Sequence, residues 1–179
     1  MAENLNYAAS GSKCGNGNSL SDNNTASCDT YGRLYTFATA TNNSTASSGV
    51  RGVCPSGWHL PNDADWNKLF RHADGTSGTE SLYSSPTAGR YLKAKEGWNS
   101  CGPSGKSYLC EDTHEFSALP GGDGYSNGNF NYVGDYAGWW SAGEYNGRRY
   151  HRNMNHNTER AGCSNNEEDG LFSVRCLQD

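Results

Sequence analysis

Apolar residues are scarce in this sequence of 179 residues. Only 34% of them are hydrophobic, and no apolar run approaches the roughly 20 residues that span a bilayer. The first seven residues also lack the basic and apolar regions of a signal peptide. We therefore expect no direct membrane insertion, and a secreted or surface-displayed protein would need an export signal or anchor that this chain does not carry.

An excess of positive charge is lacking as well. The 14 basic and 19 acidic residues give a net charge of −5 and are spread along the chain. Without a basic footprint, we exclude nucleic acid and anionic lipid as partners. Aromatic residues, at 12%, argue against disorder, because disordered chains are depleted in them. The length suits a single domain over residues 1–179.

Catalytic and metal-binding motifs are missing too. There is no G-x-S-x-G, no H-E-x-x-H and no C-x-x-C, and the five histidines have no ligand-like spacing. We expect no enzyme and no cofactor, with catalysis as the third of three alternatives. Structural calcium is open at two oxygen-rich loops, 121–129 and 165–169, although neither has the EF-hand spacing.

Seven cysteines in a polar chain indicate an oxidising compartment. Cys14 with Cys28 and Cys101 with Cys110 each bracket a short polar loop, so each pair is expected to close that loop with a disulfide. Cys54 with Cys176 would tie the middle of the chain to its end, which restricts the unfolded ensemble strongly. Cys163 is left over.

The pattern of the chain predicts an α+β domain with about two helices, short antiparallel strands and long loops. One helix begins at Pro61 or Asn62 and ends at Gly75, with apolar residues at helical spacing. A second segment, 85–98, is a helix or a strand. Strands are predicted at 31–38, 115–119, 138–142, 149–154 and 171–177, and surface loops at 10–30, 40–52 and 99–113.

Six segments resemble one family, in the same order and over nearly the whole chain. They read "AENLNY", "YGRLYTF", "CPSGWHLPNDADWNKL", "FSALPGG", "WWSAGEY" and "FSVRCLQD". This set resembles the Fibrobacter succinogenes major paralogous domain family. The resemblance implies a C-type-lectin-like fold in secreted or surface-attached bacterial proteins. In that fold the N- and C-terminal strands pair, a helix follows "GWHLP", irregular loops carry binding, and a disulfide between Cys54 and Cys176 is suitable.

The last forty residues are also similar to the variable region of proteins that diversity-generating retroelements diversify. In those systems the adenines of a template are randomised, so that AAC codons for asparagine give way to many others. The mixture of Asn with His, Arg and Gly in a segment of about 139–170 is what partial replacement would leave. Glu159, Glu167 and Glu168 are not reachable from AAC in this way, so we expect them to be fixed.

"RNMNHNTER", residues 152–160, places asparagine at every second position. Side chains alternate along a strand, so a strand over 149–157 would direct one set of residues outward and the other inward. The outward set is His151, Asn153, Asn155 and Asn157, and the inward set is Tyr150, Arg152, Met154 and His156. Outward amides add little to folding but offer donors and acceptors to a partner. The alternative is that Asn and Gly only fill a polar hairpin.

These observations predict a binding protein with a recognition surface centred on 145–168. Aromatic and guanidinium groups there carry recognition energy most often. The ligand would be a protein on another cell or a phage target; the runner-up is a surface glycan bound by an adhesion module, with Trp139 or Trp140 stacking on sugar. One of these tryptophans is expected in the core, together with Trp58, Trp66 and Trp98. The candidate ligand-binding residues are Tyr145, Asn146, Arg148, Arg149, Tyr150, His151, Asn153, Asn155, Asn157, Arg160, Asn165, Asn166 and Trp139.

Overall fold

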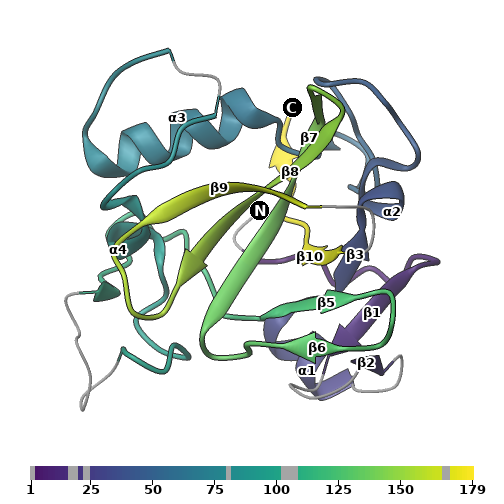
Figure 1. Cartoon of the computed structure of the whole chain (residues 1–179), viewed down its shortest axis with the longest axis horizontal. Coiled ribbons are helices and arrows are strands. Elements are labelled where there is room, and N and C mark those ends of the chain that lie inside the picture. Colours follow the sequence, from purple (N-terminus) through teal and green to yellow (C-terminus); the bar gives the residue numbers. More distant parts are fainter. Residues whose placement is uncertain (1–2, 16–19, 22–24, 80–81, 102–108, 167–169) are drawn as a thin grey trace.

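The chain folds into an α+β arrangement of short elements around a twisted sheet (Figure 1). The computed structural model describes residues 3–15, 20–21, 25–79, 82–101, 109–166 and 170–179. Four helices lie in these ranges: α1 (Thr25–Tyr31), α2 (Phe37–Thr41), α3 (Asp63–Asp74) and α4 (Ala88–Leu92). The strands are β1 (Ser12–Gly15), β2 (Leu20–Ser21), β3 (Leu34–Thr36), β4 (Trp58–His59), β5 (Asp123–Tyr125), β6 (Phe130–Asn131), β7 (Tyr136–Tyr145), β8 (Arg148–Asn155), β9 (Ala161–Asn166), β10 (Gly170–Ser173) and β11 (Leu177–Gln178).

The main sheet joins strands from both ends of the chain. Its order is β2-β1-β3-β10-β7-β8-β9, with β5 pairing with β10 and β6, while β11 and β4 form a separate pair. The strand β10 runs parallel to β7 and antiparallel to β3. Near the N-terminus, the Leu5 backbone N–H also donates to the Val174 carbonyl at 2.8 Å. The two ends therefore meet through this bond, but the first and last strands do not pair with each other: β1 pairs with β2 and β3, and β11 pairs with β4.

Helix α3 forms where the sequence predicts it, because its ends carry strong signals. The Asn62 side chain accepts from the backbone N–H groups of Ala64 and Asp65, and the Asp65 carboxylate accepts from the Asn62 N–H. This reciprocal capping box satisfies donors that the first turn leaves open. Gly75 ends the helix with φ at +71°, a conformation that glycine adopts easily.

The apolar residues form two main clusters, one on each face of the strands β7 and β8. Helices α3 and α4 cover one face with residues such as Trp66, Phe70 and Leu92 around Trp139. The other cluster packs Phe37 and other residues against Trp140 and Phe172. Trp139 and Trp140 point to opposite faces of β7, yet both are buried because an apolar cluster covers each face at this point of the strand. Trp66 and Trp98 are buried as predicted, and Trp58 is half-buried.

Four predictions of local structure are wrong in part. The tract 10–30 contains β1, β2 and α1, and the strand expected at 31–38 ends where α2 begins at Phe37. The Thr36 hydroxyl accepts from the Thr39 N–H and so caps α2, which turns the chain out of the sheet. The segment 115–119 contributes only an isolated bridge between Ala118 and Lys93. The strand predicted at 171–177 is divided into β10, which ends at Ser173, and β11, which begins at Leu177. The segment 85–98 adopts the helical alternative and contains one short helix, α4.

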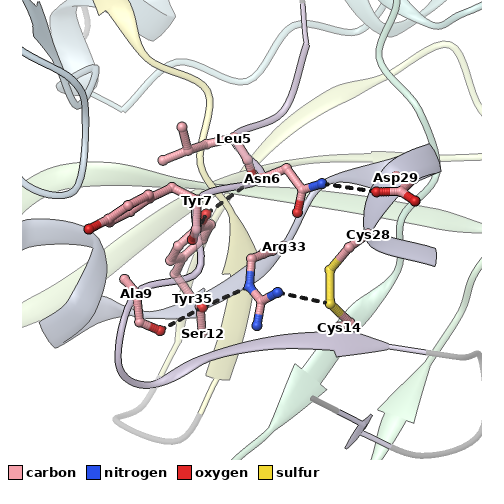
Figure 2. The surroundings of a disulfide bond; sticks show 10 residues. All are labelled: Leu5, Asn6, Tyr7, Ala9, Ser12, Cys14, Cys28, Asp29, Arg33 and Tyr35. Carbon is pink, nitrogen blue, oxygen red and sulfur yellow. Dashed lines mark hydrogen bonds between the residues drawn. A yellow bond between two sulfur atoms is a disulfide. The ribbon is translucent and has the colours of Figure 1, made fainter. Parts of the chain in front are cut away.

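The three predicted disulfides are present, and Cys163 is the free cysteine. Figure 2 shows how the bond between Cys14 and Cys28 sits beside Arg33, which donates from Nε to the Ser12 hydroxyl at 2.8 Å. The Tyr35 hydroxyl donates to the Tyr7 carbonyl at 2.8 Å. These contacts hold the N-terminal segment against β3. No helix in the described part of the chain is long and apolar enough to cross a membrane.

Candidate functional site

The strand β8 has two faces, and its neighbours share them in register. On one face, Asn155 lies opposite Tyr136 of β7, and Asn153 lies between Gly138 of β7 and Gly162 of β9. On the other face, Arg152 and Met154 point toward α3 and α4 and are buried, as the inward set predicts. The alternation expected from the asparagine row is therefore present. It does not expose every residue of the outward set.

His151 is a correction to the prediction, because it is only 5% exposed. Its ring stacks on Phe172 with a centroid distance of 4.0 Å, and its Nε2 lies 3.0 Å from the Tyr136 hydroxyl. Burial, with a smaller effect of Arg152, lowers the pKa of His151 to about 3, so the ring is neutral. A side chain enclosed in this way cannot be presented to a ligand.

Trp139 is a second correction. Its side chain is 0% exposed, its Nε1 donates to the Asn4 side-chain oxygen at 2.8 Å, and its ring packs near Trp66. Trp140 is 1% exposed and donates to the Tyr35 carbonyl at 2.7 Å. Both tryptophans are part of the frame, so neither offers a platform on which a sugar could stack.

The two arginines in the middle of β8 differ in their surroundings. Arg152 is fully buried and contacts the Asp63 carboxylate at 3.0 Å, the Asn67 side-chain oxygen at 3.3 Å and the Cys163 sulfur at 2.9 Å. Arg149 is half-buried, lies over the Phe37 ring and pairs with Glu144 at 3.1 Å. Only Arg149 can therefore take part in recognition. Tyr150 is half-buried, and by the alternation of β8 it lies on the same face of the strand as Arg152.

The amides differ among themselves as well. Asn153 is half-buried, and its side-chain nitrogen donates to the Ser164 hydroxyl at 2.9 Å. It lies so close to β9 that a Cβ on Gly162 would be 2.4 Å from its side-chain oxygen, so a larger residue there would require the amide to move. Asn155 and Asn157 are exposed. Asn153 is thus partly a sheet contact, while the next two amides of the row face solvent.

The predicted residues gather at two ends of β8 rather than in one patch. Asn146, with φ at +53°, and Arg148 are exposed in and beside the turn between β7 and β8, and Asn165 lies opposite Tyr150. Asn155 and Asn157 lie at the other end, about 20 Å away at the rise of a strand. Arg160 is exposed in the loop before β9. The side chains of Tyr145 and Asn166 lie outside the described part.

A buried lysine supports the second of these ends. Lys93 is 0% exposed, and its ammonium group donates to the carbonyls of Asn155 at 3.0 Å and Thr158 at 2.7 Å. Burial lowers the pKa of Lys93 to about 8. Because the Lys93 ammonium group donates to two carbonyls of one turn, it fixes the backbone of the turn that carries Asn157.

Tyrosines that the sequence did not single out lie beside Asn155. Tyr136 is its cross-strand neighbour, and the ring of Tyr132 meets that of Tyr136 edge-on at 6.5 Å between centroids. Tyr132 is 58% exposed and Tyr125, on β5, is 37% exposed. We call the surface formed by Tyr125, Tyr132, Tyr136, Asn153 and Asn155 the aromatic–amide face. The signal in the sequence is the three tyrosines of 121–136, of which the loop predicted for calcium, 121–129, contains only Tyr125.

At the base of this face lies Asp123, which shares the side of β5 with Tyr125. Asp123 is 8% exposed, and its Oδ1 is buried without a hydrogen-bond partner among the described residues. Burial raises the pKa of Asp123 to about 6. Its charge is the largest cause of the raised pKa of Tyr125 and, after burial, contributes to that of Tyr136. The carboxylate therefore lies next to two phenols.

Metal ligands do not gather in the part of the chain that is described. No group of three His, Cys, Asp or Glu side chains there could hold a metal ion. Of the two loops considered for calcium, 121–129 forms β5 and a turn, with Asp123 as its one carboxylate. The other, 165–169, lies partly outside the described residues.

Comparison with known families assigns the chain. The family model described as the Fibrobacter succinogenes major domain matches residues 1–178, so the chain belongs to this family. The resemblance seen in the six sequence segments is confirmed by this match. No curated protein and no solved structure matches the chain significantly.

Proposed function

We propose that this protein is a non-catalytic binding protein whose recognition surface is built on β7, β8 and β9 and the loops between them. One observation carries the proposal: Arg148, Asn155, Asn157, Arg160 and Asn165 are all exposed. Between them lie residues that are buried in the frame, namely His151, Arg152, Met154 and Ala161. Exposed side chains on a rigid frame can be exchanged with little effect on folding. This is the property that a recognition surface needs.

We further propose that the scaffold is C-type-lectin-like and that a retroelement diversifies the segment of about 139–170. The long hairpin of β7 and β8, the helix after "GWHLP" and the disulfide between Cys54 and Cys176 support the scaffold. The exposure of Asn155, Asn157 and Asn165 supports diversification. The burial of His151 and Arg152 indicates positions that stay constant within the segment.

The coding DNA tests the proposal of diversification. We expect AAC codons at Asn155, Asn157 and Asn165, and a nearby near-identical copy of this segment that differs only at adenines, beside a reverse transcriptase gene. The differences should fall on codons of exposed residues and spare those of His151 and Arg152. A locus without such a copy would contradict diversification.

A protein ligand is the first candidate, and the three disulfides support display outside the cell. The mixture of tyrosine, arginine and asparagine suits a protein surface, since aromatic and guanidinium groups are frequent in hot spots. Selection of binders to a chosen protein from a display library varied at Arg148, Asn155, Asn157, Arg160 and Asn165 tests this directly. Failure to recover any binder from a well-folded library would contradict it.

A glycan is the second candidate, and the exposed rings of Tyr125 and Tyr132 favour it over the buried tryptophans. Tyrosine rings can stack on a sugar, and the oxygens of neighbouring amides and a carboxylate can accept hydrogen bonds from its hydroxyl groups. A glycan array separates the two: binding that Tyr132→Ala abolishes favours adhesion to carbohydrate. Silence on the array, together with binders from the library, favours the protein ligand.

A further inference from the structure

Asp123 has an arrangement that folding alone does not explain. A carboxylate that is buried without a partner destabilises a protein, because it loses its hydration and gains no compensating bond. Asp123 is 8% exposed with an unpartnered Oδ1, and the side chains beside it that interact with it are phenols. No arginine, lysine or histidine within the described residues pairs with it. A group of opposite charge is what this position lacks.

The tyrosines around Asp123 supply the remaining elements of a cation site. Tyr125 and Tyr132 expose 37% and 58% of their surface, and Tyr132 meets Tyr136 edge-on. The face of an aromatic ring attracts an ammonium or guanidinium group, and a nearby carboxylate adds a direct ion pair. A protein with net charge −5 also attracts cations at long range.

We propose that Asp123, Tyr125, Tyr132 and Tyr136 form a receptor for one cationic side chain, lysine or arginine, of the protein ligand. This inference rests on the proposed function, because the receptor lies within the aromatic–amide face and Tyr136 is the cross-strand neighbour of Asn155. The receptor residues lie on β5, directly after β6 and at the beginning of β7, outside the segment of about 139–170. It would therefore be a fixed contact beside an exchangeable one.

A cation is favoured over a sugar by the charge balance of the site. Sugar hydroxyls donate hydrogen bonds but leave the buried negative charge uncompensated, whereas a cation neutralises it. The raised pKa of Asp123, about 6, shows that this charge is unfavourable in the free protein. A cation that enters the site should lower that pKa, so binding of the cation and loss of the proton are linked.

The test is a titration of the isotopically labelled protein followed by amide chemical shifts. The probes are Nα-acetyl-lysine methylamide and Nα-acetyl-arginine methylamide, with the norleucine derivative as the neutral control of the same shape and methyl glucoside as the sugar. We expect one of the two cationic probes to shift the amides of Asp123, Gly124 and Tyr125 saturably, with Kd on the order of millimolar. The norleucine derivative should shift them at least tenfold less.

Two variants and a pH series make the titration specific. Asp123→Asn should weaken the cationic probe at least tenfold, while Asp29→Asn, which removes an exposed carboxylate on α1, should leave it unchanged. Tyr132→Ala should weaken it about two- to five-fold and keeps the site testable if Asp123→Asn fails to fold. Between pH 7.5 and 5 the affinity should fall about tenfold as Asp123 gains its proton. The titratable groups that interact with Asp123, Tyr125 and Tyr136, have raised pKa values and stay neutral over this range.

The outcomes separate this inference from the proposed function. Equal shifts from the norleucine and cationic probes, no shift from either cationic probe, binding unaffected by Asp123→Asn, or binding of the glucoside alone would each overturn the cation receptor. None of these outcomes affects the tests of the proposed function, which are the codon pattern of 139–170 and the selection of binders from the library.

Discussion

Replacing Asp123 by asparagine should stabilise the protein at neutral pH. Burial raises the pKa of Asp123 from 3.8 to about 6, a difference of about two pH units and so about 3 kcal/mol. Because the folded state holds the proton more tightly, this group favours folding below pH 3.8, and that contribution is lost as the pH rises through 6. At pH 7.5 the charged carboxylate therefore opposes folding.

The magnitude for the variant is smaller than the full 3 kcal/mol, since the amide is neutral but still a buried polar group with an unpaired oxygen. We expect Asp123→Asn to raise the free energy of unfolding by about 1–3 kcal/mol at pH 7.5 and to leave it nearly unchanged at pH 4. Urea denaturation of both proteins between pH 4 and pH 7.5 measures this difference. Taking the difference removes the titration of all other groups.

Asp29→Asn is the matched control, since it removes a negative charge from an exposed position and should show no such pH dependence. The reasoning would be refuted by an Asp123→Asn variant that is less stable than the parent at pH 7.5. A stability difference that is the same at every pH would refute it too. The expected result would identify a residue whose charge opposes the fold, as residues retained for binding do.

The remaining predictions concern the frame. Arg152→Met should lower the free energy of unfolding by about 2–3 kcal/mol, because it removes the buried guanidinium that contacts Asp63, Asn67 and Cys163. Arg149→Met, at a partly exposed pair with Glu144, should lower it by about 1 kcal/mol or less. Urea denaturation of the two variants gives the comparison, and equal effects would contradict it. Removing the disulfide between Cys54 and Cys176 by a double substitution to alanine should cost about 5 kcal/mol in the chain-entropy model, since this bond closes a loop of 122 residues. Removing the bond between Cys14 and Cys28, which closes 14 residues, should cost about 3 kcal/mol. Thermal unfolding should show the larger loss of stability for the first variant, and the reverse order would count against the entropic account.

Local signals made several features predictable from the sequence. The capping residues Asn62 and Asp65 and the end at Gly75 fixed α3, and the alternation of polar and apolar residues placed β8 and its inward Met154. Short spacing predicted the disulfides Cys14–Cys28 and Cys101–Cys110, and the family resemblance favoured Cys54–Cys176. The helix caps, the alternation of β8 and the two short disulfides each depend on residues that are close together in the sequence.

Features that depend on long-range packing were not predictable. Period two assigned His151 to the outward face, but Phe172, from a strand that joins β7 from the other side, covers that position. Trp139 and Trp140 are buried together because both faces of β7 carry apolar clusters there. Asp123 was missed for a similar reason, since Tyr136, one of the phenols that interact with it, lies on another strand. Nothing local in "GGDGYSNGN" indicates that its carboxylate is buried.

The central claim is that the frame tolerates exchange of the exposed residues of 139–170, and one measurement tests it most directly. A variant with serine at Arg148, Asn155, Asn157, Arg160 and Asn165 is compared with the single variant Trp139→Ala by urea denaturation. We expect the five exposed changes together to lower the free energy of unfolding by about 2 kcal/mol at most, and the one buried change to lower it by about 3–5 kcal/mol. A fivefold variant less stable than Trp139→Ala would contradict the account.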